Sequence, residues 1–194
     1  MKQLSRQELM SLEQYSEKRN SFRAEVMAHK KNRHLSLGEN LTLYFEDRLT
    51  IQYQIQEMLR IEKIFEADGI QEELDAYNPL IPEGKNLKAT FMIEYPQVEQ
   101  RKQMLAQLIG VEDKLWLQVE GFDKVYPIAD EDLQRDNAEK TSSVHFLRFE
   151  FSAEMIAKLK TGASLAAGVD HENYQQHVAE IPQNIRNSLV NDFD

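Results

Sequence analysis

The chain has 194 residues, of which 41% are hydrophobic and 29% charged, and its formal net charge is −10 at pH 7. This length and composition fit one folded domain, residues 1–194, and exclude an intrinsically disordered chain. The absence of cysteine excludes disulfides, thiolate metal sites and cysteine nucleophiles, and the acidic balance argues against nucleic acid as a partner, because affinity for phosphate comes mostly from Lys and Arg.

Hydropathy places the chain in the cytoplasm. No apolar run approaches the roughly 18 residues that a membrane-spanning helix needs. The first ten residues, MKQLSRQELM, lack the apolar stretch of a signal peptide. We therefore expect a cytoplasmic protein that does not act on membranes.

Residues 1–34 form a basic segment with a helical pattern. They hold eight Lys and Arg against four Glu, whereas the rest of the chain holds 15 against 29 acidic residues. A capping-box pair, Ser5 and Glu8, precedes a thin apolar stripe with helical spacing. Two interpretations follow: the segment packs on the acidic remainder of its own chain, or it meets an anionic partner.

Residues 35–70 change from a strand pattern to a helix pattern. Apolar and polar residues alternate on both sides of the turn GEN, which is typical of a β-hairpin. The following segment, TIQYQIQEMLRIEKIFEADGI, is an amphipathic helix over about residues 50–66, with Thr50 as its expected N-cap and Gly69 as its end.

The rest of the chain alternates strands with short helices. Residues 74–86 read as a loop that could cover a pocket. Strands are expected in LKATFMIEY, in VHFLRFEF and in SLAAGVD, and a hairpin turns at Gly121. Because hairpins outnumber βαβ patterns, we predict an α+β fold with a mainly antiparallel sheet, packed by the helix at 50–66 and crossed by the N-terminal segment.

One carboxylate, Glu62, falls on the apolar side of that helix. At about 100° per residue it lies between Ile51 and Ile55. Burial of an unpaired charge costs several kcal/mol, so this carboxylate needs a cation, a proton or a cavity. We expect Arg48 or Arg148 to pair with it across the core. Glu62 could serve either in a structural ion pair or as a residue that faces a ligand or a metal.

Histidines supply two weaker candidates. His145 alternates with Leu and Phe in VHFLRFEF, which suits a hydrogen-bonded core histidine better than a ligand. The stretch GVDHENYQQH places Tyr174 and the possible metal ligands Asp170, His171 and His177 in a strand end followed by one or two helical turns. Since it contains neither HExxH nor paired ExxH motifs, a capped turn is the simpler interpretation, and no metal is expected.

Several common activities have no support in the sequence. The glycine loops of nucleotide-binding proteins, GxGxxG and GxxxxGK[ST], are absent, and so is the GxSxG motif of serine hydrolases. No cofactor is indicated by any motif.

Four segments together resemble a known family. LTLYFEDRLTIQYQIQEMLRIEKI, ELDAYNPLIPEGKNLKATFMIEYP, TSSVHFLRFEF and LAAGVDHENY are similar to the bacterial domain of unknown function 3501 family, and the resemblance covers about residues 5–181. Members are described as bacterial and often encoded near rubrerythrin-like proteins and iron–sulfur oxidoreductase subunits. The resemblance thus implies a link to redox or peroxide metabolism by association only. It carries over no catalytic residues.

Two functional hypotheses remain. The first is a non-catalytic accessory or binding protein that works beside a redox or peroxide-response system and engages a protein partner. The second is an enzyme or a His/carboxylate metal-binding domain with a pocket around Glu62. RNA binding through KKNRH is disfavoured, because few aromatic residues interleave with the basic ones.

Overall fold

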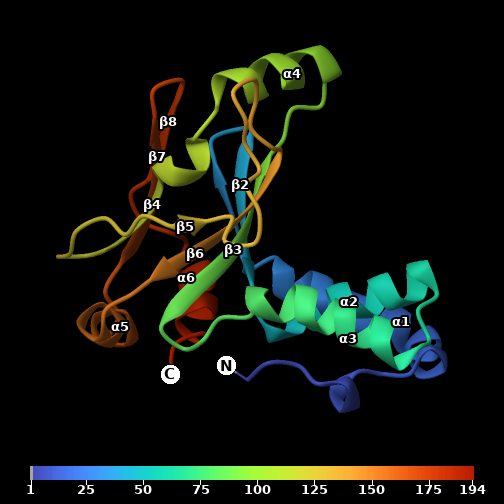
Figure 1. Cartoon of the computed structure of the whole chain (residues 1–194). Coiled ribbons are helices and arrows are strands. Elements are labelled where there is room, and N and C mark those ends of the chain that lie inside the picture. Colours follow the sequence, from blue (N-terminus) through green and yellow to red (C-terminus); the bar gives the residue numbers. More distant parts are fainter. Residues whose placement is uncertain (1) are drawn as a thin grey trace.

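The computed structural model describes residues 2–194 (Figure 1). In that range it contains six α-helices and eight β-strands. The strands are β1 (His34–Leu37), β2 (Leu41–Glu46), β3 (Asn86–Ile93), β4 (Leu115–Val119), β5 (Ile128–Ala129), β6 (Val144–Glu150), β7 (Leu165–His171) and β8 (Tyr174–Val178). The helices are α1 (Leu12–Lys30), α2 (Arg48–Glu62), α3 (Ala67–Tyr77), α4 (Val98–Gln107), α5 (Ala153–Lys160) and α6 (Gln183–Val190). Single 3₁₀ turns are η1 (Arg6–Glu8), η2 (Asn78–Leu80) and η3 (Val111–Lys114).

Two antiparallel sheets organise these elements. The larger has the strand order β1-β2-β3-β6-β5, and the smaller has the order β4-β7-β8. Every strand pair within them is antiparallel. The α+β class and the antiparallel sheet are therefore confirmed, as is a helix near the N-terminus.

The main core lies between the two sheets. Alternate residues of β2, β3 and β6 point into it, as the period of two in a strand requires. They meet the inner face of the smaller sheet and residues of α4, α5 and α6. The side chains at the centre of this core are Leu43, Phe45, Leu87, Phe91, Leu147, Phe149, Leu117, Val119, Leu165 and Val169.

The helices α1, α2 and α3 form a separate layer with its own core. Figure 1 shows them lying together at one end of the long strands, on the side away from the smaller sheet. Ile51, Ile55 and Leu59 of α2 pack against Leu74 of α3 and Ile81 in a cluster distinct from the main core. The predicted helix therefore exists, but its apolar face packs on other helices and not on the inner face of the sheet.

The ends of α2 differ from the prediction. Asp47, not Thr50, is the N-cap, and the two residues form a capping box in which the Asp47 side chain accepts from the backbone N–H of Thr50. The helix ends at Glu62, because Lys63 takes the left-handed conformation with φ 55°. Gly69 lies inside α3, a helix that the sequence analysis did not resolve.

Glu57 of α2 holds α1 in place. Its carboxylate accepts hydrogen bonds from Tyr15 Oη at 2.6 Å and from Arg19 Nε and Nη2 at 2.7 and 2.8 Å. The side chain is only 14% exposed. The Arg19 hydrogen bonds, helped by those of Tyr15 and Arg60, lower the Glu57 pKa to about 2.

Glu57→Gln is expected to lower the free energy of unfolding by about 1–2 kcal/mol at pH 7, because charged hydrogen bonds are lost from a partly screened site. The depressed pKa means that this stabilisation is complete above about pH 4.5 and is lost as the pH falls toward 2. Urea unfolding at pH 7 and pH 3 should therefore show a smaller gap between wild type and variant at the lower pH. The exposed Glu25→Gln on α1 is the control, and a gap independent of pH would contradict the assignment.

Candidate functional site

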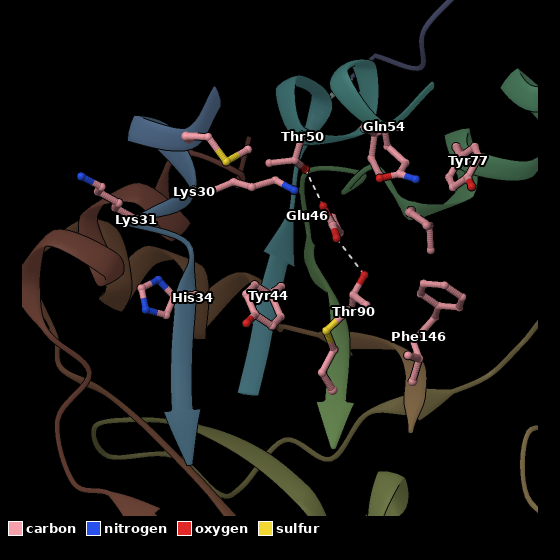
Figure 2. A pocket seen from close by; sticks show the side chains of 15 residues that line it. Lys30, Lys31, His34, Tyr44, Glu46, Thr50, Gln54, Tyr77, Thr90 and Phe146 are labelled. Carbon is pink, nitrogen blue, oxygen red and sulfur yellow. Dashed lines mark hydrogen bonds between the residues drawn. The ribbon is translucent and has the colours of Figure 1, made fainter. Parts of the chain in front are cut away.

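A groove lies in the angle between the helical layer and the outer face of the larger sheet. Its volume is about 700 Å³. The outward-facing residues of β2, β3 and β6 form its floor, and the ends of α1, α2 and α3 form its walls (Figure 2). A cavity of this size suits a small organic molecule, since ligand sites usually measure about 300–1,000 Å³.

Glu46 lies on the floor of the groove and is held by two threonines. Thr50 Oγ1 donates to its Oε2 at 2.6 Å, and Thr90 Oγ1 donates to its Oε1 at 2.7 Å (Figure 2). The Thr50 hydroxyl is itself oriented, because it accepts from the Asp47 backbone N–H at 2.9 Å. A carboxylate has about four lone-pair positions, so acceptor capacity is left over for a ligand.

Among residues 2–194, no cationic side chain forms an ion pair with this carboxylate. Within residues 2–194, no Lys, Arg or His nitrogen lies within 4.0 Å of it. Lys88 is its direct neighbour across β2 and β3, but the Lys88 ammonium donates to the Pro79 carbonyl at 2.7 Å and pairs with Glu83 at 3.6 Å. Glu46 is thus a fixed negative charge that faces a cavity.

The rim beside α1 is cationic. Lys30, Lys31 and His34 line it, at the end of α1 and the start of β1. The His34 ring stacks on Tyr44 with the centroids 6.3 Å apart and an interplanar angle of 25°. In Figure 2 the Lys30 side chain extends toward the Glu46–Thr50 pair, whereas Lys31 points away from it. The groove therefore offers positive and negative charge to one ligand.

The opposite wall is apolar. Tyr77, Leu80 and Phe146 line it, and the same three residues also border an adjoining cavity of about 490 Å³. Arg135 stacks on the Phe146 ring, with its guanidinium carbon 4.6 Å from the ring centroid. Aromatic and aliphatic walls favour the flat or apolar body of a ligand.

Comparison with known proteins identifies the family. A family model described as "Protein of unknown function (DUF3501)" matches residues 3–193. The chain belongs to this family.

A solved structure has the same fold as this DUF3501 chain. It is a crystal structure of a protein of unknown function from Burkholderia pseudomallei K96243, with 54% sequence identity, a TM-score of 0.95 and full coverage of both chains. No curated protein matches this chain. No helix among residues 2–194 combines the length and the apolar character needed to cross a membrane.

Glu62 is not buried. It is exposed at the C-terminal end of α2 and does not line the groove. The predicted ion pairs across the core are also wrong. Arg48 pairs with Glu8 at 2.5 Å, and Arg148 pairs with Glu131 at 2.6 Å and with Glu150. Glu62 is the last residue of α2, and its side chain is exposed there and does not line the groove.

His145 is fully buried on the inner face of β6. Its Nδ1 lies 2.6 Å from Asp130 Oδ2 and its Nε2 lies 2.9 Å from Thr141 Oγ1, while Phe91 stacks on the ring at 5.9 Å. Tyr174 lies on β8, where its hydroxyl donates to the Leu37 carbonyl at 2.8 Å. These residues do not meet each other or Arg148, and a ligand-binding role for them stays a prediction.

The stretch GVDHENYQQH forms the end of β7, a turn and β8, not a strand end followed by helix. Asp170 pairs with Lys124 at 2.6 Å. His171 Nε2 lies 3.1 Å from the Ile109 carbonyl and its Nδ1 accepts from the Asn173 N–H, so hydrogen bonds occupy both ring nitrogens. His177 is exposed. The three candidate ligands do not form a metal site among the described residues.

Glu46 and Lys30 were not singled out as a site by sequence reasoning. Tyr44 and Glu46 alternate with buried Leu43 and Phe45, which places a carboxylate on the outer face of a strand. Thr50 follows Glu46 by four positions, so the sequence also placed a hydroxyl near this carboxylate. No sequence pattern pointed to Lys30, because α1 reaches the groove only through tertiary packing.

Proposed function

We propose that this DUF3501 protein is a non-catalytic binding protein whose groove holds a small organic zwitterion. The ligand would carry an amino group, an acidic group and an apolar body. The observation that carries the proposal is Glu46, a carboxylate fixed by two threonine hydroxyls, without a cation partner among residues 2–194, on the floor of a cavity. A binding protein gains affinity when its polar groups are fixed before the ligand arrives.

Each part of the groove supports one part of the ligand. An ammonium can donate to the free lone pairs of Glu46. An acidic group can meet Lys30 at the rim, and opposite charges on the rim and the floor select zwitterions over simple acids or amines. The aromatic rings of Tyr44, Tyr77 and Phe146 suit an apolar or aromatic side chain.

The test is a panel of aromatic and aliphatic amino acids together with their N-acetyl and carboxamide derivatives. Binding is followed by thermal shift and then by titration calorimetry. We expect amino acids with apolar side chains to raise the melting temperature. Glu46→Gln should weaken their binding about tenfold, because one charge-assisted hydrogen bond is lost.

Glu94→Gln is the matched control. The Glu94 carboxylate also accepts from a threonine hydroxyl, Thr42 Oγ1 at 2.8 Å, but it is exposed and does not line the groove. This variant should bind like wild type. If no zwitterion in the panel binds, or if Glu46→Gln binds as tightly as wild type, the proposal is wrong.

The redox or peroxide-response association is a further part of the proposal and rests on the family resemblance alone. We propose that the ligand-bound protein acts as an accessory to such a system through a protein partner. Purification from the native host with and without the bound amino acid checks this. Recovery of a stoichiometric oxidoreductase subunit supports the association, and recovery of no stable partner would contradict it.

A further inference from the structure

A histidine and two carboxylates meet inside the protein, away from the groove. His145 lies on β6, Glu112 lies in the turn η3, and Asp130 directly follows β5. One nitrogen or oxygen of each lies within 4.8 Å of the others. The side chains are 0%, 7% and 9% exposed, respectively, so this cluster belongs to the interior.

Asp130 fixes the orientation of the His145 ring. Its Oδ2 lies 2.6 Å from Nδ1, while its Oδ1 accepts from the Phe146 N–H at 2.9 Å and from Arg135 Nη1 at 3.2 Å. Because an ionised carboxylate only accepts, Nδ1 carries the proton. A carboxylate bonded to one ring nitrogen is the usual support of a histidine that uses the other nitrogen as a metal ligand.

The other nitrogen, Nε2, faces a set of oxygen atoms. Thr141 Oγ1 lies at 2.9 Å, the Ser142 carbonyl oxygen at 3.1 Å and Glu112 Oε2 at 3.9 Å. Two ligand atoms that each lie about 2.1 Å from one ion can be at most about 4.2 Å apart. All three separations fall inside this limit.

Glu112 supplies an independent observation. Its Oε2 is fully buried and has no hydrogen-bond partner among the described residues. The side chain points at His145 and is 7% exposed. Burial raises the pKa of Glu112. An unpartnered buried carboxylate is costly, so such a group in a native fold indicates a cation, a proton or an unseen water.

We propose that His145 Nε2 and the Glu112 carboxylate bind a divalent transition-metal ion, with Thr141 Oγ1 and the Ser142 carbonyl oxygen as further ligands and Asp130 as the positioning residue. One imidazole with oxygen ligands, and no thiolate, suits Mn²⁺, Fe²⁺ or Zn²⁺. The ion compensates the charge of Glu112. Because β6 separates this cluster from the groove, the metal site does not depend on the proposed zwitterion site.

The experiment uses the full chain, purified without an affinity tag or chelator and then dialysed against Mn²⁺ or Zn²⁺ alone. Bound metal is counted by mass spectrometry after removal of free ion. We expect about one ion per chain, and a rise in melting temperature of about 5 °C when the ion exceeds its dissociation constant a hundredfold. Less than about 0.1 ion per chain for both metals would overturn the proposal.

Two variants separate this site from adventitious surface binding. Glu112→Gln preserves the size of the side chain and should lose the bound ion and the melting shift. Asp113→Asn removes the same charge from the exposed neighbouring residue of η3 and should behave like wild type. Equal binding by both variants would overturn the assignment. Circular dichroism of the metal-free proteins is the control that checks whether each variant folds.

Discussion

Arg33→Met is expected to lower the free energy of unfolding by about 3–5 kcal/mol at pH 7, because it breaks a buried ion pair and leaves the other charge uncompensated. The Arg33 side chain is 2% exposed. Its guanidinium pairs with Asp192, lies 3.4 Å from Asp47 and donates to the Phe45 and Glu46 carbonyls at 3.1 Å. One side chain therefore joins the end of β2 to the C-terminal segment.

The loss caused by Arg33→Met should depend on pH. Burial raises the pKa of Asp192 to about 6, against the opposing effect of Arg33. Without the guanidinium that pKa rises further. A carboxyl whose pKa is higher in the folded state contributes stability at low pH and loses it as the pH rises. The gap between wild type and variant should thus narrow from pH 7 to pH 5.

Urea unfolding at both pH values measures this gap. Arg23→Met is the control, since Arg23 is exposed on α1 and should change stability by less than about 0.5 kcal/mol. Similar losses in the two variants would show that Arg33 is not the central cation of this junction. A gap that widens at pH 5 would contradict the raised pKa of Asp192.

Most of the longer strands were predictable because their signal is local, whereas β8 was wrongly predicted as helical turns. In VHFLRFEF, alternate residues are buried in the structure, from His145 to Phe149, as the period of two requires. The N-terminal basic segment also carried local helix signals, although Ser11 and not Ser5 caps α1. Ion pairs from Arg19 to Glu57 and from Arg33 to Asp192 connect this segment to its own chain.

The position of Glu62 was not predictable from the helical wheel. The sequence analysis extended the helix past Glu62. In the structure it ends there, because Lys63 adopts a left-handed conformation, and the sequence has no Gly or Asn at this position to indicate the end. A wheel also shows which side is apolar without showing what covers it. In this fold the cover is a second helical layer, so the apolar stripe of α2 never faces β6.

The two proposed sites depend on contacts between distant segments. Thr90 reaches Glu46 only because β2 pairs with β3 in one register. Glu112 and His145 are 33 positions apart and belong to a turn and a strand that meet through folding alone. The sequence analysis identified His145 as a candidate and expected no metal, since the other ligand lay outside any recognisable motif.

Lys30→Glu is expected to weaken the binding of the zwitterion by about 100-fold, because it removes an attraction at the rim of the groove and adds a repulsion. Lys30 lies in the last turn of α1 and its ammonium is 5.9 Å from the Tyr53 ring centroid. A cation in this turn also favours the helix dipole, so the variant should lose about 0.3–1 kcal/mol of stability. Lys18→Glu, exposed on the same helix, is the control for net charge.

The carboxamide derivative of the same amino acid distinguishes the contribution of Lys30 at the rim from that of Glu46 on the floor. It retains the ammonium that meets Glu46 and lacks the acidic group that meets Lys30. Lys30→Glu should not weaken its binding, because this ligand is a cation and the new carboxylate attracts it, whereas Glu46→Gln should still weaken it about tenfold. Titration calorimetry measures the binding of both ligands at one fixed ionic strength, because salt screens the ammonium–Glu46 contact of the carboxamide as well as the rim contact of the acid. If Lys30→Glu lowered the affinity for the acid and for the carboxamide by the same factor, the acidic group would not bind at Lys30, because only the acid carries that group.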